Sequence, residues 1–292
     1  MLDGRGDQAA GLRRLFDQQA SRLVAFVAGS AGVGKSLLVA NLAASLAQQG
    51  QQVLVLDEDN KVAAYSGVST PHDWWQVIAQ KKTLSDVLLM VAPKIRILPI
   101  ALAVKNLAKL TPYQQDALRE SFAEMSSLAQ VILINTSLDH PLGFSPLGLA
   151  SQETVVVLSA VGNAVTDAYS LVKKASLVYS HPHFRILVSK ARTSHEAHSL
   201  FENMARVSHQ RGLARLEWAG FVPLDENLRQ ASRLYQPVEG LFPHSAAAKA
   251  YREIAHNILS WTGSGEHGNA IEPFVSRLLA LSQAMNPQAI YA

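Results

Sequence analysis

A short segment near the start of the chain has the residue types and spacing needed to hold phosphate groups. The segment AGSAGVGKSLL contains, in the pattern G-x-x-x-x-G-K-S, the residues Gly29, Gly34, Lys35 and Ser36. In such a pattern the glycines let backbone N–H groups close around a phosphate, the lysine neutralises its charge, and the serine hydroxyl can ligate Mg²⁺. The pattern predicts a phosphate-binding loop, and the alternative is a glycine-rich turn that binds nothing.

The flanking residues predict a strand before this loop and a helix after it. The apolar run LVAFVA covers 23–28, and the helical pattern SLLVANLAASLAQQ covers 36–49 and stops at Gly50. A helix that starts at the loop directs its first N–H groups toward a bound anion. We therefore expect nucleotide contacts from Gly29, Ser30, Ala31, Gly32, Val33, Gly34, Lys35, Ser36 and Leu37.

Short apolar runs alternate with helix-length patterns along the rest of the chain. The predicted strands are 52–57, 95–100, 130–135, 154–159, 184–189 and 216–223. The predicted helices are 111–128, 164–179, 194–211 and 244–262. Continuous apolar runs are typical of strands covered on both faces. We expect an α/β fold, a doubly wound and mostly parallel sheet with helices on both faces and the phosphate loop after the first strand.

The composition fits one large globular domain. The 292 residues are 48% hydrophobic, include no cysteine and carry a formal charge of +3. No apolar run approaches the roughly 20 residues that span a bilayer, so we expect a cytoplasmic protein. No basic block indicates nucleic-acid binding. We expect an N-terminal segment at 1–20, a nucleotide-binding domain at 21–262, and a flexible joint with a C-terminal helix at 263–292. The histidines show no metal-ligand spacing and are expected at the surface, among them His181, His183, His195 and His198.

The order of these segments resembles the MinD/ParA group of deviant P-loop ATPases and, within it, the FlhG proteins (also called FleN), which regulate flagellar number and placement. The similarity covers nearly the whole chain and includes DQAAGLRRL (7–15), TLSDVLL (83–89), NLAKLTPYQQDALRESF (106–122), TDAYSLVKK (166–174) and GFVPLDENLRQA (220–231). The resemblance implies ATP or ADP with Mg²⁺ as ligands and an ATP-dependent homodimer. It also implies, as partners, the GTPase FlhF, flagellar C-ring proteins and a flagellar transcription regulator.

Three residues depart from this family's pattern. The family has a lysine that reaches the partner subunit's phosphates where this chain has Ser30, and an aspartate of the magnesium shell where it has Asn135. An asparagine that helps to read adenine is replaced by Ser189. Losing a cation at the transferring phosphate typically costs about 10³ to 10⁵ in rate, and losing an outer-shell carboxylate about 10- to 100-fold. Phosphate binding needs neither of the first two residues, so we expect binding to outlast hydrolysis.

Asp57 and Asp59, in the segment LDEDN, are the remaining candidates for catalytic chemistry. By the resemblance, Asp59 orients the attacking water, and Lys35 acts on the phosphates. Asp57 and Ser36 are the expected magnesium ligands. The alternative for the two aspartates is an acidic strand end that faces solvent. Asn135 keeps an amide oxygen that can bind a metal-bound water, but it brings no negative charge.

The N-terminal segment resembles the short FlhG sequence that stimulates the GTPase FlhF. Its apolar residues recur at helical spacing, yet some ten residues are too few for a stable free helix, so we expect the segment to fold on a partner. By the resemblance, Gln8 helps to position FlhF's attacking water. The alternative is a frayed start to the domain. The expected partner-binding residues are Asp7, Gln8, Gly11, Leu12, Arg13, Arg14 and Leu15.

The C-terminal segment IEPFVSRLLALSQAM predicts an amphipathic helix. FlhG-like proteins carry a membrane-targeting helix at this place, which implies a peripheral contact at the inner face of the cell membrane. The alternative is a helix that packs on its own domain, and the sequence does not separate the two. The expected membrane-facing residues are Phe274, Val275, Leu278, Leu279 and Leu281.

Two function classes follow from these features. The first is an FlhG-like nucleotide-binding regulator with weak or absent ATP hydrolysis, which Ser30 and Asn135 favour. The second is an active MinD/ParA-like ATPase that cycles between an ADP monomer and a membrane-bound ATP dimer. A DNA-partition ATPase is disfavoured by the N-terminal segment and by the lack of a basic stripe.

Overall fold

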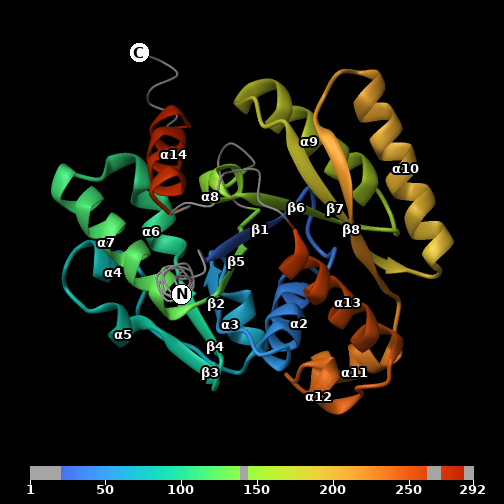
Figure 1. The fold of residues 1–292 in the computed structure, drawn as a ribbon, viewed down its shortest axis with the longest axis horizontal. Coiled ribbons are helices and arrows are strands. Elements are labelled where there is room, and N and C mark those ends of the chain that lie inside the picture. Colours follow the sequence, from blue (N-terminus) through green and yellow to red (C-terminus); the bar gives the residue numbers. More distant parts are fainter. Residues whose placement is uncertain (1–20, 139–143, 262–270, 286–292) are drawn as a thin grey trace, which may run out of the picture.

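The computed structural model describes residues 21–138, 144–261 and 271–285, which are built around one eight-stranded sheet (Figure 1). The strand order is β3-β4-β2-β5-β1-β6-β7-β8, with β3 antiparallel to β4 and every other neighbouring pair parallel. This confirms the predicted fold class. The strands are β1 (Arg22–Ala28), β2 (Val53–Asp57), β3 (Leu89–Ala92), β4 (Ile95–Pro99), β5 (Val131–Asn135), β6 (Glu153–Ser159), β7 (His183–Ala191) and β8 (Arg215–Pro223).

Helices cover both faces of the sheet, which explains the continuous apolar strands. On one face, α2 and α13 share a core with Val24 and Phe26 of β1. On the other face, α7, α9 and α10 pack over alternate strand residues, including Leu23 and Ala25. The longer helices are α2 (Lys35–Gln48), α7 (Pro112–Leu128), α9 (Ala164–Tyr179), α10 (Ser194–Gln210), α13 (Ala246–Ser260) and α14 (Ile271–Ala284).

Each predicted strand and helix is present in the described residues, with ends displaced by a few residues at most. Helix α7 begins within a residue of the predicted start, because Thr111 is an N-cap that accepts a hydrogen bond from the backbone N–H of Gln114 and Pro112 lies in the first turn. The structure adds β3, a partly exposed edge strand, and several short helices. These are α3 (Lys61–Tyr65), α4 (Trp75–Ile78), α5 (Leu84–Val87), α6 (Ala101–Asn106), the 3₁₀ helix η1 (Leu107–Lys109), α8 (Pro146–Ala150), α11 (Glu226–Arg233) and α12 (Val238–Leu241).

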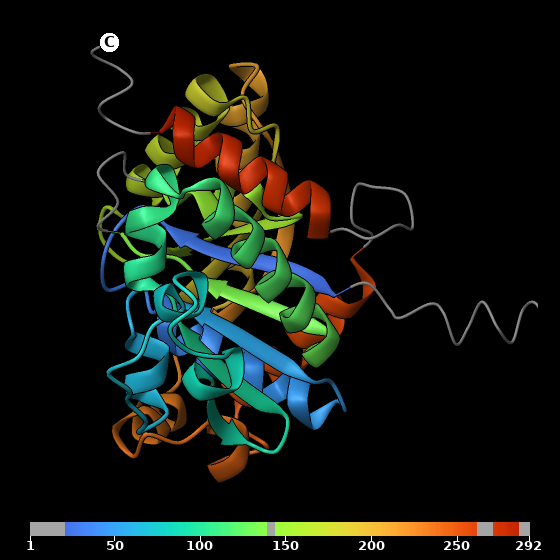
Figure 2. The ribbon, with the colours of Figure 1, turned by 90° about the vertical axis from the view of Figure 1, so that its left-hand side faces the viewer.

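Helix α14 packs on its own domain, against α7, α8 and η1, as both views show (Figures 1 and 2). Phe274, Val275 and Leu278 are buried, and the ring of Phe274 meets the ring of Phe122 at a centroid distance of 5.0 Å. Leu279 is also buried and Leu281 is partly buried. Of the two alternatives for this helix, the structure therefore shows packing on the domain, with the predicted membrane-facing side chains in the core.

The expectation that the histidines lie at the surface is wrong for His181. Its side chain is buried, its ring lies tilted against Phe184 at a centroid distance of 4.7 Å, and its Nδ1 accepts a hydrogen bond of 3.2 Å from the guanidinium of Arg277 on α14. Burial, together with the nearby charge of Arg277, lowers the pKa of His181 to about 4. The histidine follows α9 directly, and nothing in its local sequence indicates that a distant helix covers it. Among the described residues, no helix has the length and apolarity to cross a bilayer.

Candidate functional site

The phosphate loop joins β1 to α2 and depends on its glycines for two different physical reasons. Gly32 and Gly34 have φ angles of +78° and +91°, in the left-handed region that favours glycine. Gly29 has a different constraint, because a Cβ atom there would lie 2.4 Å from the backbone carbonyl of Asp167 on α9. The first glycine therefore admits a neighbouring helix, while the other two shape the loop.

Lys35 and Ser36 occupy the first two positions of α2, below the loop, and both are buried. The Lys35 ammonium donates to Oδ1 of Asn135 at 2.5 Å and to the backbone carbonyl of Thr136. Burial lowers the pKa of Lys35 to about 8, although the charges of Asp59, Glu58 and Asp57 oppose that shift. The lysine is therefore a desolvated cation held by acceptors from the end of β5, at the anion-binding end of a helix.

Asn135 connects the lysine to the two predicted acidic residues. Its position in β5 pairs with Asp57 in the neighbouring parallel strand β2, so the two side chains emerge side by side. The amide nitrogen donates to Oδ1 of Asp57 and to Oδ1 of Asp59, both at 2.8 Å. The other oxygen of Asp57 accepts the backbone N–H of Ala63 at 2.9 Å. Burial raises the pKa of Asp57, and these hydrogen bonds oppose the rise.

This network brings together every residue for which a catalytic or metal role is expected. Asp59 also forms an ion pair with Lys61 at 3.1 Å. The Ser36 hydroxyl lies 3.4 Å from the amide oxygen of Asn135, a long contact compared with the others. An amide at the centre ties the carboxylates in place through its donors, but it supplies no charge of its own. The alternative of a solvent-facing acidic strand end does not describe Asp57, which is completely buried.

A pocket of about 360 Å³ opens beside the loop, at the carboxyl ends of β7 and β8. Ligands of open α/β sheets bind at the carboxyl ends of the strands, and pockets of this size accept small molecules. The pocket is lined by Val33, Gly34, Leu37, Leu38, Ser189, Lys190, Val222, Pro223, Leu224, Asp225, Leu228, Arg229, Ser232, Arg233 and Tyr251. The pocket adjoins the phosphate loop through Val33 and Gly34.

The sequence matches, over residues 24–238, the model of the CobQ/CobB/MinD/ParA nucleotide binding domain. The chain belongs to this family. It is also 29% identical to the antiactivator FleN of Pseudomonas aeruginosa, over 92% of this chain and 97% of that protein. The flagellum site-determining protein YlxH of Helicobacter pylori is 23% identical, over 91% of this chain and 93% of that protein. The resemblance to FlhG/FleN proteins is thus confirmed at the level of sequence.

Solved structures of the MinD/ParA type share the fold. MinD of Aquifex aeolicus has a TM-score of 0.64 at 16% identity and covers 83% of this chain and 98% of its own. MinD of Pyrococcus horikoshii, in a complex with Mg-ADP, has a TM-score of 0.60 at 19% identity and covers 82% of this chain and 96% of its own. In this CobQ/CobB/MinD/ParA chain, the loop, α2 and the ends of β2 and β5 lie together and are the candidate nucleotide site.

The residues of this family member fit a nucleotide with magnesium. The loop backbone and the Lys35 ammonium suit phosphate oxygens, and the Ser36 hydroxyl and Asp57 carboxylate are oxygen ligands of the kind Mg²⁺ takes. The described residues contain no cluster of three metal-binding side chains. When bound, Mg²⁺ would neutralise charge on the phosphates.

Sequence reasoning missed two charged side chains at the site of this family member. Glu58, between the two aspartates, is 6% exposed and accepts hydrogen bonds from the Ser137 backbone and the Ser145 hydroxyl, and burial raises its pKa to about 7. The run of three acidic residues in LDEDN was the available signal. Lys190, in β7 after Ser189, donates to the carbonyl oxygen of Gly32 at 2.5 Å. No local pattern indicated that this lysine reaches the loop.

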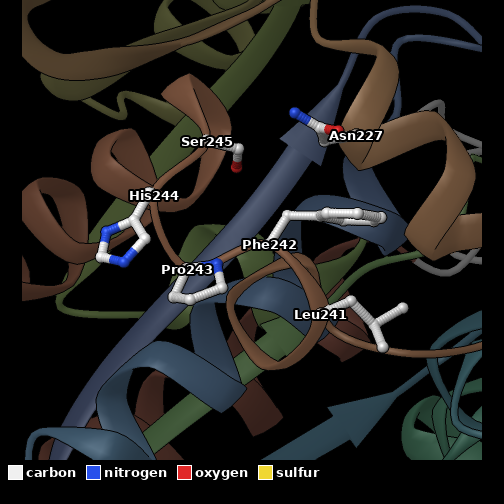
Figure 3. A pocket seen from close by; sticks show the side chains of 6 residues that line it. All are labelled: Asn227, Leu241, Phe242, Pro243, His244 and Ser245. Atoms are coloured by element: carbon white, nitrogen blue, oxygen red, sulfur yellow. The ribbon is translucent and has the colours of Figure 1, made fainter.

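A second hollow, of about 420 Å³, lies beside α11 and the start of α13 (Figure 3). It is lined by Asn227, Leu241, Phe242, Pro243, His244 and Ser245. Figure 3 shows the ring of His244 turned away from Leu241 and Phe242, so these side chains do not converge on one point. None of the predicted site residues lines this hollow, and we assign it no function.

The expected partner-binding residues of the N-terminal segment, Asp7 to Leu15, lie outside the described residues. The same holds for residues 262–270, where the sequence predicts a flexible joint. The roles expected of these two segments therefore stay predictions.

Proposed function

We propose that this chain is a nucleotide-binding regulator of flagellar number and placement that binds ATP or ADP with Mg²⁺ and hydrolyses ATP slowly or not at all. The observation that carries this proposal is the position of Asn135. A neutral amide stands between Lys35 and the two aspartates, at the strand end where the family has a carboxylate. The phosphate-binding elements remain, while the negative charge of the family's aspartate in the magnesium shell is missing at Asn135.

The flagellar part of the proposal rests on the similarity to FleN and YlxH, whose names describe an antiactivator and a flagellum site-determining protein. Deletion of the gene in its own organism tests it, with flagella counted and located by electron microscopy. We expect altered flagellar number or position, restored by the wild-type gene and not by Lys35→Ala. Unchanged flagella in the deletion strain would contradict the proposal.

The N-terminal segment is proposed to stimulate the GTPase FlhF independently of ATP turnover. A peptide of residues 1–20 should accelerate GTP hydrolysis by the cognate FlhF. Gln8→Ala should lose the acceleration more than the binding, with Arg13 and Arg14 supplying ionic contacts. Equal stimulation by both peptides would remove Gln8 from the mechanism. No stimulation by the wild-type peptide would remove the segment.

An ATP-dependent homodimer is proposed from the family resemblance. Membrane contact is proposed as well, and the position of α14 makes it more demanding. The apolar side chains of the helix are buried, so α14 must leave α7, α8 and η1 before it can enter a lipid surface. Co-sedimentation with anionic liposomes, with and without a non-hydrolysable ATP analogue, measures this directly. Binding that requires the analogue supports release of the helix, and no binding in either state rejects the membrane proposal. Contacts with C-ring proteins and a flagellar transcription regulator are proposed from the same resemblance.

The second candidate function is an active ATPase of the MinD/ParA type, and one contact favours it. The Lys190 ammonium already lies at the loop, against the Gly32 carbonyl, and a basic group there could replace the cation missing at Ser30. Under this alternative, Lys190→Ala would reduce turnover by about 10³-fold or more. Under the first proposal, turnover is low already and Lys190→Ala changes it little.

A further inference from the structure

The carboxyl end of β7 holds the phosphate loop at two consecutive peptide groups. The Lys190 ammonium donates to the backbone carbonyl oxygen of Gly32 at 2.5 Å. The buried hydroxyl of Ser189 donates to the carbonyl oxygen of Val33, also at 2.5 Å. Both contacts start from neighbouring residues of one strand and end on neighbouring residues of the loop. Two side chains of β7 therefore act on the same part of the loop.

The backbone of β7 departs from regular strand geometry at the lysine that makes the first of these contacts. Ser189 and Ala191 pair with consecutive residues of β8, so Lys190 is an extra residue in β7. Its φ angle is +57°, in the left-handed region that residues other than glycine rarely adopt. A bulge re-aims a side chain, and residues in sparsely populated conformations cluster at functional sites. Here the side chain is aimed at the loop, because its Cε lies 3.8 Å from the position of a Cβ atom added to Gly34.

Fixing these two carbonyl groups also fixes the N–H groups of the same two peptides. In a planar trans peptide, the C=O of one residue and the N–H of the next point in opposite directions. The carbonyls of Gly32 and Val33 point toward donors on β7, so the N–H groups of Val33 and Gly34 point away from those donors. Neither N–H donates to an acceptor within the described part of the chain. Successive N–H groups held in this way form a concave anion-binding site.

We propose that Ser189 and Lys190 are positioning residues that hold the loop in its phosphate-binding conformation before a ligand arrives. The inference rests on the proposed nucleotide binding, and it concerns the shape of the loop and not the identity of the base. Each side chain acts through a carbonyl group of the loop, so neither has to touch the nucleotide. This role of Lys190 differs from that of a cation placed at the transferring phosphate, which requires the ammonium to contact the ligand.

The two contacts matter because the loop is rich in glycine. Gly32 and Gly34, both at positive φ, have more conformational freedom than other residues. A loop that is ordered only when the ligand binds loses that freedom at the expense of affinity, whereas a loop that is already held does not. The contacts from β7 therefore raise the affinity for phosphate groups, whatever nucleoside carries them.

Isothermal titration calorimetry of the full chain with Mg²⁺ and either ADP or inorganic pyrophosphate tests the proposal without depending on hydrolysis. Pyrophosphate occupies only the phosphate part of the site, so an effect exerted through the loop appears with both ligands. Ser189→Ala removes a neutral hydroxyl, and we expect both dissociation constants to rise by about 3- to 10-fold, the usual effect of one hydrogen bond. Lys190→Met removes the ammonium and keeps the stem of the side chain, and both constants should rise at least as much.

Three further variants are the controls. Lys190→Arg keeps a donor at the loop and should bind both ligands within about threefold of wild type, which is less than the loss of one hydrogen bond typically costs. Ser170→Ala and Lys173→Ala make the same kinds of change at exposed positions of α9 and should bind as wild type does. Thermal unfolding of every variant confirms that it is folded at the temperature of the titration.

The outcomes separate this inference from the proposed function. A loss of affinity for ADP alone overturns the inference, because the two side chains would then contact the nucleoside. Wild-type affinity for both ligands in folded Ser189→Ala or Lys190→Met overturns the role of that residue. A wild-type protein that binds ADP and not pyrophosphate also overturns it, since a loop held ready should bind phosphate groups alone. Binding of neither ligand by wild type overturns the proposed function and this inference with it.

Discussion

The candidate nucleotide site and the surface on which α14 packs show two different relations between a sequence pattern and a function. At the nucleotide site, polar side chains from β2, β5 and α2 converge, and Asn135 bonds to both aspartates and to Lys35. On α14, the residues that the sequence predicts to face a membrane instead pack in one cluster with Phe122. A buried polar network requires partners of matching chemistry, whereas an apolar stripe requires only that something covers it.

The largest expected effect on stability comes from removing a buried ring from α14. Phe274→Ala should lower the free energy of unfolding by about 3–5 kcal/mol, because the side chain is 2% exposed and packs on Phe122. Urea denaturation measures the change. Gln283→Ala, at an exposed position of the same helix, should stay within about 0.5 kcal/mol of wild type. A Phe274→Ala protein as stable as wild type would show that α14 does not pack on the domain in solution.

The second change separates the nucleotide site from the fold. Lys35→Ala should weaken ADP binding by about 2–5 kcal/mol, since it removes a buried cation from charged phosphates. Its thermal stability should not fall, because burial already disfavours the charged lysine in the folded state. Calorimetric titration provides the affinity, and Lys173→Ala, at an exposed position of α9, is the control. If Lys35→Ala bound ADP as tightly as wild type does, the phosphates would not bind at the loop that contains Lys35.

The third test uses pH to examine how α14 is held. The pKa of His181 is about 4 in the folded protein and near 6.5 when unfolded, so the unfolded state binds more protons between these values. Stability should therefore fall as pH decreases from 6.5 toward 4, by about 2–3 kcal/mol from this group. The groups that act on the ring are Arg277 and His183, and Arg277 opposes its protonation.

Urea denaturation of wild type and His181→Asn at pH 7 and pH 4.5 isolates this contribution. The variant should lose less stability on acidification than wild type does. His209→Asn, at an exposed position of α10, should follow wild type. Identical acid sensitivity in wild type and His181→Asn would show that the histidine is solvated, and that its contact with Arg277 does not persist.

The sequence predicted those parts of the molecule in which local pattern and tertiary environment agree. The apolar run of β1, the glycine loop and the Thr111–Pro112 start of α7 each carry a local physical reason for their structure. The convergence of Asp57 and Asn135 is explained by the register of the parallel strands β2 and β5, which pairs these two residues. These elements position most of the candidate site.

The remaining features depend on contacts between distant segments. Short helices such as α4 and α12 span about one turn, too few residues for a period to emerge, and the edge strand β3 is partly exposed. The burial of His181 depends on Arg277, which is 96 residues away, and the contact of Lys190 depends on a loop 158 residues away. A single segment carries no information about such partners.

The proposed function requires that nucleotide binding survives where hydrolysis is lost, and one paired measurement tests this. ATP affinity and ATP turnover are measured on the same preparations of wild type and of the double variant Ser30→Lys with Asn135→Asp. We expect both proteins to bind ATP and the double variant to hydrolyse it at least 10- to 100-fold faster, since a cation and a carboxylate have been restored. Wild-type turnover already equal to that of the double variant would contradict the proposed function.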